Sequence, residues 1–248
     1  MEPEQLEAGG LPDEEREAFL SVCQRQNIPL SAQQIDLLDR YVADLLHWNK
    51  KINLISRKDE ANIWEKHISH CISLLFAVHI PSGGKMVDIG SGGGLPGIPI
   101  NILRPDLTFL LIDATRKKTE AVSEIIKGLG LKGIEIIWGR AEEVALRPQY
   151  RSKFDFAFAR GVASLSELID WTKPFLNDHP EGARDGEQKT LPQLSSPALL
   201  AFKGGDLSDE VRKAEQRHRS VTIRVLDLHY DTKRVQDGSE KKLVVVNW

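Results

Sequence analysis

Glycine is concentrated in residues 87–100, VDIGSGGGLPGIPI, between an apolar run typical of a buried strand and a segment that reads as the start of a helix. Glycine accepts a positive φ and, because it has no Cβ, lets a ligand approach the backbone closely. The helix that follows adds free N–H groups and the positive end of its dipole. Such a strand-to-helix turn is typical of a site for a nucleotide-like cofactor.

Two motifs compete for this loop. Gly92, Gly94 and Gly97 fit the G-x-G-x-x-G fingerprint of dinucleotide sites, whereas Asp88 followed by Gly90, Gly92 and Gly94 fits an acid followed by G-x-G-x-G. A carboxylate at the end of the first strand would repel a pyrophosphate but attract the amino and sulfonium groups of S-adenosylmethionine. The residues favour adenosylmethionine and leave a nicotinamide dinucleotide as the alternative.

Three further polar side chains end predicted strands: Asp113 the second, Arg160 the fourth and Lys203 the fifth. Ligands of doubly wound sheets bind outside the carboxyl ends of the strands, so these side chains are expected beside the glycine loop. Asp113 could accept hydrogen bonds from ribose hydroxyls, and Arg160 and Lys203 are the candidate catalytic residues. The sequence has no CxxC pair or His-rich partner, so no metal site is expected.

The apolar pattern predicts an α/β fold with a doubly wound sheet of seven strands, most of them parallel. After residue 83, helical segments separate five short apolar runs, which are KMVDI, LTFLLIDA, IEIIW, FDFAFA and ALLAFK. Two more β-rich runs, TIRVLDLHY and KKLVVVNW, are joined by a polar segment that leaves no room for a crossover helix. The last strand is therefore expected to run antiparallel.

Changes in composition divide the chain into a tail, a cap and a main domain. Residues 1–15 mix Glu, Gly and Pro without a period and read as a disordered tail. Residues 16–82 are expected to form an N-terminal helical cap, and residues 83–248 the cofactor-binding domain. Within that domain, the polar stretch 178–197, rich in Pro and Gly, is predicted to be a mobile insertion.

The cap is predicted to contain two main helices. Ser31 and Gln34 form a capping-box signature ahead of apolar residues at helical spacing, which predicts a helix of about four turns. A second helix is expected over roughly 59–78. On it, His67 has the apolar neighbours of a core histidine.

The composition indicates a cytoplasmic protein that does not insert into membranes. The chain has 248 residues, of which 41% are hydrophobic, enough for a full core. Its acidic N-terminus does not resemble a signal peptide, no apolar run reaches about 18 residues, and only two cysteines occur, far apart in sequence. For such a chain a monomer is the expected state.

Any nucleic-acid binding must come from local basic surfaces, because the net charge is −3. Two basic clusters are candidates for contacts with RNA phosphates, although such runs are more often only solvated surface. They are Lys50, Lys51, Arg57 and Lys58 in the cap, and Arg116, Lys117 and Lys118 after the second strand.

Several motifs, in this order, resemble those of the bacterial ribosomal small-subunit methyltransferase G family, also called glucose-inhibited division protein B. They are WNKKINL at 48–54, the histidine in EKHISH, DIGSGGGLPGIPI, RAEE at 140–143, ARGVASL at 159–165 and AFKGG at 201–205. The resemblance runs from about Leu30 to the C-terminus. It implies a class I methyltransferase (Rossmann-like) fold and transfer of a methyl group from adenosylmethionine to N7 of a guanine in the 530 loop of 16S ribosomal RNA, free or in the 30S subunit.

The resemblance also implies which residues hold the cofactor. They are Gly90 and Leu95 at the methionine and ribose part, Ala141 and Glu142 at the adenine, and Arg160 near the reaction centre; Asp88, Asp113 and Ala114 follow from the general class I pattern. The chain departs from the family pattern H-I-x-D-S after the cap histidine, where it has His67, Ile68, Ser69, His70 and Cys71. Any hydrogen bond that the family's aspartate makes from the cap to the active site is therefore not expected here.

Three other functions remain compatible with the residues. The cofactor half of the fold is shared by class I methyltransferases that act on small molecules or proteins. An NAD-dependent oxidoreductase and a non-catalytic RNA-binding protein that keeps the cofactor site are the other two.

Overall fold

The computed structural model describes residues 13–177, 191–228 and 241–248, and seven strands within them form a single sheet. The strands are β1 (Lys85–Ile89), β2 (Thr108–Asp113), β3 (Ile134–Trp138), β4 (Phe156–Arg160), β5 (Ala198–Gly204), β6 (Thr222–Asp227) and β7 (Lys241–Asn247). Their order in the sheet is β3-β2-β1-β4-β5-β7-β6. Neighbours from β3 to β5 pair in parallel, and β7 pairs antiparallel with both β5 and β6. The predicted doubly wound sheet with an antiparallel last strand is confirmed.

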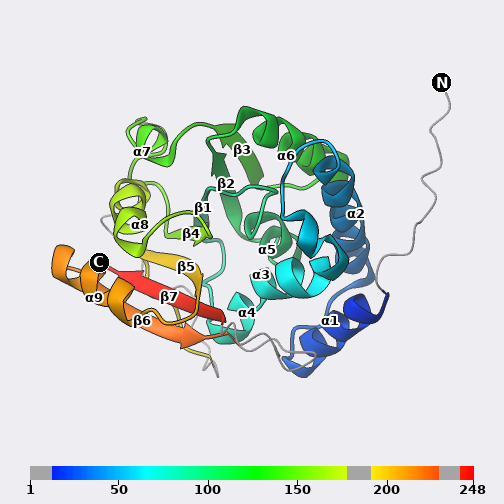
Figure 1. Ribbon diagram of the computed structural model, residues 1–248, viewed down its shortest axis with the longest axis horizontal. Coiled ribbons are helices and arrows are strands. Elements are labelled where there is room, and N and C mark those ends of the chain that lie inside the picture. The colour runs from blue at the N-terminus through cyan, green and yellow to red at the C-terminus, as the bar shows by residue number, and fades with distance from the viewer. Residues whose placement is uncertain (1–12, 178–190, 229–240) are drawn as a thin grey trace.

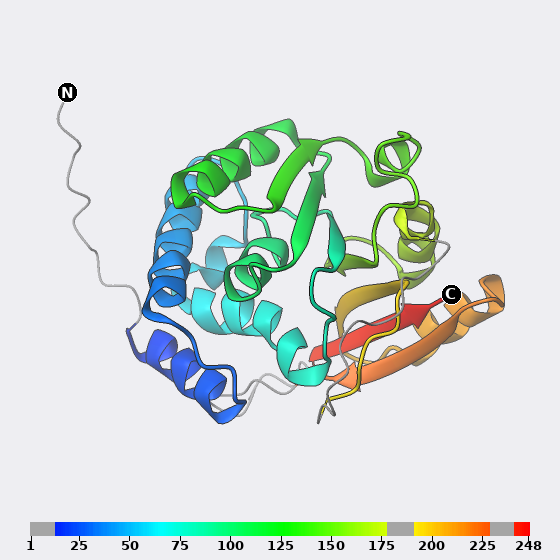
Figure 2. The same cartoon turned by 180° about the vertical axis from the view of Figure 1, so that it is seen from behind.

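Helices cover both faces of this sheet (Figures 1 and 2). On one face lie α5 (Gly97–Leu103), α6 (Arg116–Leu129) and the helices of the cap; on the other lie α7 (Ala141–Val144), α8 (Leu165–Thr172), η3 (Lys173–Phe175) and α9 (Ser208–Arg217). Successive strand residues point to opposite faces. In β2, Phe109 therefore joins the core beneath α6, and Leu110 joins the core beneath α8.

The cap begins with α1 (Asp13–Arg25) and α2 (Ala32–Asn49). The capping box predicted for α2 is present, because the Ser31 hydroxyl accepts from the Gln34 N–H and the Gln34 side chain accepts from the Ser31 N–H. Residues 13–15, assigned to the tail from the sequence, belong to α1. The rest of the predicted tail lies outside the described residues.

The helical stretch predicted over 59–78 is present, but it is not one regular α-helix. The chain instead forms a succession of short segments, which are η1 (Arg57–Asn62), η2 (Trp64–Ser69), α3 (His70–Ile72) and α4 (Leu74–Ala77). Residues 67–75 are all buried, whereas a regular amphipathic helix would keep one face in water. The wide π-helical turn of η2 accompanies this burial, and π-helical turns often occur at functional sites.

The end of the predicted insertion is part of the fold. The His79 N–H donates to the Pro192 carbonyl at 2.9 Å, and the Leu194 N–H donates to the His79 carbonyl at 3.0 Å. The Leu194 side chain is buried in the core shared with the cap. Residues 192–194 therefore pair with the end of the cap, and the carbonyls of Ser195 and Pro197 accept from the Asn247 side chain of β7. Residues 178–190 lie outside the described residues.

Tyr41 joins the cap to the glycine loop. Its ring is fully buried in α2, and its hydroxyl donates to the Gly93 carbonyl at 2.9 Å. A Cβ at Gly93 would lie 2.6 Å from the Leu45 side chain of the same helix. Helix α2 thus packs directly on the loop, with no room for a side chain at Gly93.

A Tyr41→Phe variant is expected to lose about 1–3 kcal/mol of its free energy of unfolding, because the buried Gly93 carbonyl loses its donor. Urea denaturation followed by circular dichroism measures the loss. Tyr150→Phe, at a half-buried position outside the cap, is the matched control. Equal denaturation midpoints for Tyr41→Phe and the wild type would mean that the hydroxyl does not hold the loop.

Candidate cofactor and nucleic-acid site

The glycine loop has the backbone conformation that its sequence predicts. Gly90, Gly92 and Gly94 have φ values of +68°, +57° and +89°, a region that residues with a Cβ rarely adopt. At Gly94 an added Cβ would also lie 2.4 Å from the Ile98 side chain. The loop therefore requires glycine at these positions. Gly94 is buried, whereas Gly90 and Gly92 are partly exposed at the carboxyl end of β1.

Asp88 is a buried carboxylate with one oxygen available for a ligand. Its side chain has no exposed surface, and Oδ2 accepts from the Gly97 N–H at 3.0 Å. Oδ1 is buried and has no hydrogen-bond partner within the described part of the chain. Burial raises the pKa of this carboxyl well above its usual range, although the Gly97 N–H and the Arg160 guanidinium act in the opposite direction. The residues thus fit a cationic group such as that of adenosylmethionine, which would offset the burial of the charge.

Asp113 connects the loop to the end of β2. Its Oδ2 accepts from the Gly92 N–H at 2.9 Å, and its Oδ1 accepts from the Thr115 N–H at 2.8 Å. A carboxylate oxygen has more than one acceptor position, so these bonds leave capacity for ribose hydroxyls. Its placement agrees with the predicted role.

Residues expected near the adenine and the methionine lie around the same strand ends. The Gly139 N–H donates to the Asp113 carbonyl at 3.1 Å, which brings the turn after β3 next to the end of β2. Ala141 and Glu142 follow this turn at the start of α7, while Ala114 is exposed directly after Asp113. Leu95, in contrast, is almost fully buried beneath the loop.

Arg160, at the end of β4, is held by a histidine of the cap. Its Nη2 donates to His67 Nδ1 at 2.9 Å, so Nδ1 is the acceptor and a neutral ring carries its proton on Nε2. His67 Nε2 lies 3.6 Å from Asp59 Oδ2. Asp59, His67 and Arg160 therefore form a polar chain from η1 of the cap to the edge of the sheet. The hydrogen bond to His67 uses one of the five N–H donors of the Arg160 guanidinium.

His67 makes the stability of the fold depend on pH. Burial, assisted by the Arg160 charge, lowers the pKa of the ring to about 4 from 6.5. Above pH 6.5 the ring is neutral whether the chain is folded or unfolded, whereas between pH 6.5 and 4 only the unfolded chain takes up the proton. We expect the free energy of unfolding to fall by roughly 3 kcal/mol over that range. His70, whose pKa is also lowered by burial, adds a decrease of the same sign.

Urea denaturation at pH 7 and pH 4.5 measures this decrease, and His67→Gln is expected to remove part of it. Glutamine keeps an acceptor for Arg160 but does not titrate. An equally steep decrease in His67→Gln would assign the pH dependence to other groups.

Lys203 lies at the predicted edge, but it contacts the protein. Its Nζ donates to the Ala163 carbonyl at 2.7 Å and to Glu210 Oε1 at 2.6 Å. The same Glu210 oxygen accepts from the Leu165 N–H at 2.6 Å. Lys203 thus fixes the loop after β4, where the Val162 side chain would lie 2.6 Å from a Cβ on Gly90.

Both basic clusters flank the glycine loop. We call Lys50, Lys51, Arg57 and Lys58 the cap cluster, and Arg116, Lys117 and Lys118 the α6 cluster. Asn49 shapes the turn of the cap cluster, because its buried side chain accepts from the N–H groups of Leu54 and Ile55. The Leu54 carbonyl lies 3.5 Å from the position of a Cβ on Gly92. The α6 cluster starts three residues after Asp113, whose carboxylate binds the Gly92 N–H.

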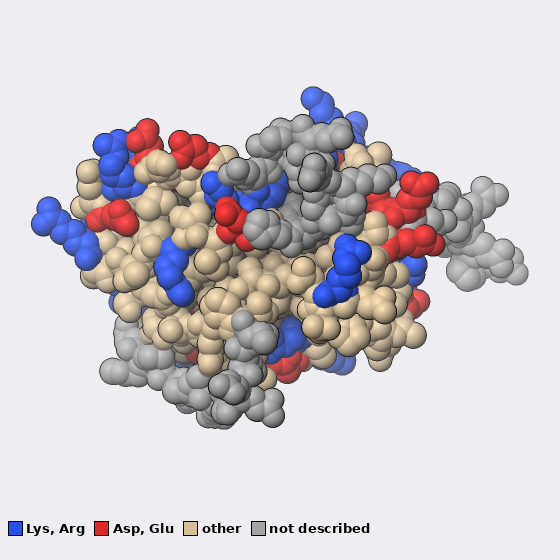
Figure 3. All heavy atoms as spheres, turned by 90° about the horizontal axis from the view of Figure 1, so that it is seen from below, with Lys and Arg blue, Asp and Glu red and all other residues tan. Residues whose placement is uncertain are grey.

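All members of the two clusters are exposed apart from the half-buried Lys118. On the face of the molecule in Figure 3, Lys and Arg side chains are interspersed with Asp and Glu among the described residues. The molecule as a whole does not attract a polyanion, because its net charge is −3. Any binding of nucleic acid would therefore depend on the local basic clusters.

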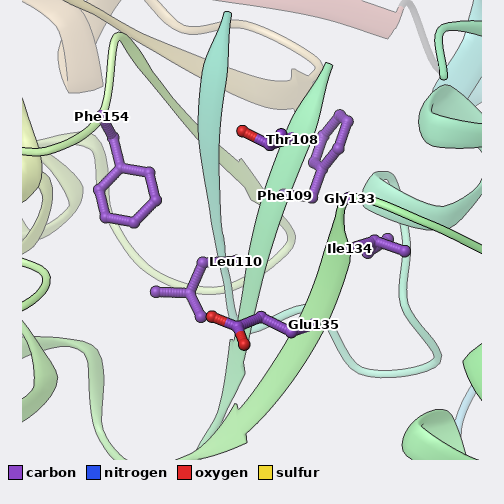
Figure 4. Close-up of a pocket in the computed structure, with 7 residues that line it drawn as sticks. All are labelled: Thr108, Phe109, Leu110, Gly133, Ile134, Glu135 and Phe154. Atoms are coloured by element: carbon purple, nitrogen blue, oxygen red, sulfur yellow. The ribbon is translucent and has the colours of Figure 1, made fainter. Parts of the chain in front are cut away.

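A pocket at the opposite ends of the strands does not belong to this site (Figure 4). It lies at the amino ends of the strands and is lined by Thr108, Phe109, Leu110, Gly133, Ile134, Glu135 and Phe154. Within the described ranges no group of three His, Cys, Asp or Glu side chains could hold a metal ion. None of the described helices is long and apolar enough to span a bilayer.

Four residues of this arrangement were missed by the sequence reasoning or given only a core role: Tyr41, Asp59, His67 and Glu210. Two of them have partners far along the chain, 52 positions away for Tyr41 and Gly93 and 93 for His67 and Arg160. The available signal is a polar side chain among apolar ones, since buried polar groups almost always have partners. That signal does not identify the partner.

Comparisons with known proteins show which family the chain resembles. A family model described as rRNA small subunit methyltransferase G matches residues 34–182. The chain is 39% identical to Ribosomal RNA small subunit methyltransferase G of Chlorobium limicola over 83% of this chain and 84% of that protein. It is 36% identical to the protein of that name from Chlorobium chlorochromatii, over 94% and 92%. The match to that of Moorella thermoacetica, at 38% identity, spans 60% of this chain and 62% of the relative.

Among solved structures, a SAM dependent methyltransferase from Aquifex aeolicus shares 14% identity, with a TM-score of 0.48 over 77% of this chain and 95% of that one. M. jannaschii TYW2 in complex with AdoMet also shares 14% identity, with a TM-score of 0.45 over 67% and 68% of the two chains.

Proposed function

The chain belongs to the rRNA small subunit methyltransferase G family, and we propose that it transfers a methyl group from S-adenosylmethionine to N7 of a guanine in the 530 loop of 16S ribosomal RNA. Relatives of that name match most of the chain, which supports the RNA substrate. The choice of N7 and of that loop comes from the resemblance of the motifs to the family.

The observation that carries the cofactor assignment is the buried Asp88 beside the glycine loop. Its Oδ1 has no partner in the described part of the protein, and Gly90 and Gly92 of the adjoining loop are partly exposed. Adenosylmethionine supplies a methyl group on a positively charged sulfur. Asp88 would bind the cationic end of the cofactor, Asp113 its ribose, and the turn that leads to Ala141 and Glu142 its adenine.

Methylation at N7 requires no general base, because this ring nitrogen is neutral and has an exposed lone pair. The chain must mainly orient the two reactants and exclude water, an effect worth up to ~7–11 kcal/mol in well-oriented reactions. His67 fits a mechanism without a general base, because its Nδ1 accepts a hydrogen bond from Arg160. With a pKa of about 4, its ring is neutral near pH 7.

Arg160 is the side chain that we propose to contact the reacting groups. Its remaining N–H donors suit guanine O6, which would orient the base without occupying N7. Lys203 was predicted to share this role. Because its contacts go to Ala163 and Glu210, we propose that it acts through the loop after β4, as a positioning residue.

The cap cluster and the α6 cluster would bind RNA phosphates on either side of the glycine loop. A target base in folded RNA must be unstacked, which costs a few kcal/mol, and phosphate contacts offset this cost. Binding should therefore weaken steeply with salt.

Incubation with a labelled methyl donor and either undermodified 30S subunits or naked 16S RNA, followed by mapping of the methylated base, tests the proposal. We expect one guanine to be labelled at N7. In parallel, calorimetric titrations with adenosylhomocysteine and with NAD test the cofactor assignment. Binding of NAD alone would favour the oxidoreductase alternative, and label at another position would correct the target.

A further inference from the structure

Trp138, the last residue of β3, is 57% exposed, the only aromatic side chain among the large exposed apolar residues of the described segments. A single exposed apolar side chain is ordinary, but this one is fixed in place. Its Nε1 donates to the Ala114 carbonyl at 3.0 Å. The Arg116 guanidinium lies 5.8 Å from the centre of the ring, and Arg116 also pairs with Glu120 at 2.9 Å.

The ring lies at the carboxyl ends of the strands, where the candidate cofactor residues also lie. Trp138 pairs in register with Asp113, the carboxylate that binds the Gly92 N–H. Its cation partner Arg116 is the first residue of α6 and of the α6 cluster. An exposed aromatic ring thus stands between the candidate cofactor site and a candidate phosphate-binding surface.

We propose that Trp138 is a stacking platform for an unpaired base of the RNA substrate, with Arg116 and its neighbours in the α6 cluster holding the adjoining phosphates. Any base has a π-face that can stack on an indole ring, and basic side chains beside an aromatic one are the usual construction of single-strand binding surfaces. The inference rests on the proposed RNA substrate and adds a subsite to it.

The arrangement favours an RNA base over the adenine of the cofactor. Residues of β3 alternate between the faces of the sheet, and Trp138 follows Ile134 and Ile136, which belong to the core under α6. Ala141, expected near the adenine, packs instead in the core under α8, on the other face. The ring of Trp138 therefore stands on the face of α6 and its basic cluster.

Two variants at this position separate stacking from structural support. Trp138→Phe and Trp138→Leu both lose the Nε1 donor to Ala114, but only phenylalanine keeps an aromatic face. Val225→Ala removes exposed apolar surface from β6, at the opposite end of the sheet, and is the matched control. The measurements are the Kd for a 16S RNA transcript across a salt series, the Kd for adenosylhomocysteine by calorimetry, and the melting temperature.

We expect Trp138→Leu to bind the RNA at least about fivefold more weakly than the wild type, and Trp138→Phe to stay within about twofold. The slope of log Kd against log salt should not change, because the ring neutralises no phosphate. The Kd for adenosylhomocysteine should be the same in all variants.

Equal RNA affinity of the phenylalanine and leucine variants would overturn the inference. So would a loss of adenosylhomocysteine affinity in Trp138→Leu with RNA binding intact, because the ring would then serve the adenine. The wild type is also measured with undermodified 30S subunits. If it bound neither the transcript nor the subunits, the proposed function itself would fail, independently of the Trp138 variants.

Discussion

A Gly92→Val variant is expected to bind adenosylmethionine at least about a hundredfold more weakly than the wild type, a loss of about 2.7 kcal/mol. Gly92 has a φ of +57°, which a β-branched residue adopts only with strain, so the loop must shift and its N–H must leave Asp113. The surrounding packing tolerates the side chain, because an added Cβ meets only the Leu54 carbonyl, at 3.5 Å. The variant should therefore stay folded. Calorimetry with adenosylhomocysteine and urea denaturation measure the two effects.

Gly130→Val is the matched control for backbone strain. Gly130 ends α6 with a φ of +67°, and an added Cβ there meets nothing within 4 Å. We expect this variant to lose stability like Gly92→Val and to bind the cofactor normally. If both variants bound the cofactor as the wild type does, the glycine loop would not be the cofactor site.

An Arg160→Ala variant is expected to lose at least about a hundredfold in kcat, the usual effect of removing a donor aimed at the reacting groups. Its free energy of unfolding should fall by about 1–3 kcal/mol, because the buried Nδ1 of His67 loses its donor. Single-turnover methylation of undermodified 30S subunits measures the chemical step. Arg160→Lys should recover little activity, since an ammonium lacks the planar fork that reaches His67 and a ligand together.

His67→Gln is the companion variant, since it keeps an acceptor for the guanidinium. It should retain far more activity than Arg160→Ala. Normal turnover by Arg160→Ala would remove Arg160 from the reaction centre and leave it a structural link between the cap and the sheet.

The features that the sequence predicted well are those set by neighbouring residues. The ends of β1 and β2 follow from short, continuous apolar runs, so Asp88 and Asp113 could be assigned to one edge of a parallel sheet. The start of α2 follows from a capping box in which donor and acceptor are three residues apart.

The features that could not be predicted depend on contacts between distant parts of the chain. The stretch 59–78 has a helical apolar period, but residues 67–75 are buried on all sides, and the helical turns change from 3₁₀ to π to α along it. Lys203 was correctly placed at a strand end, yet its side chain is held by the Ala163 carbonyl, 40 positions away, as well as by Glu210. The neutral state of His67 likewise depends first on its burial and then on the charge of Arg160, 93 positions away.

The position of β7 has a consequence for how the protein is made. This strand lies between β5 and β6, and four of its residues, 243–246, are buried. Until the ribosome has translated past residue 247 and released that segment, β5 has an unpaired edge and β6 has no partner in the sheet. Exposed strand edges promote aggregation, so the nascent chain should depend on chaperones until its last strand is inserted.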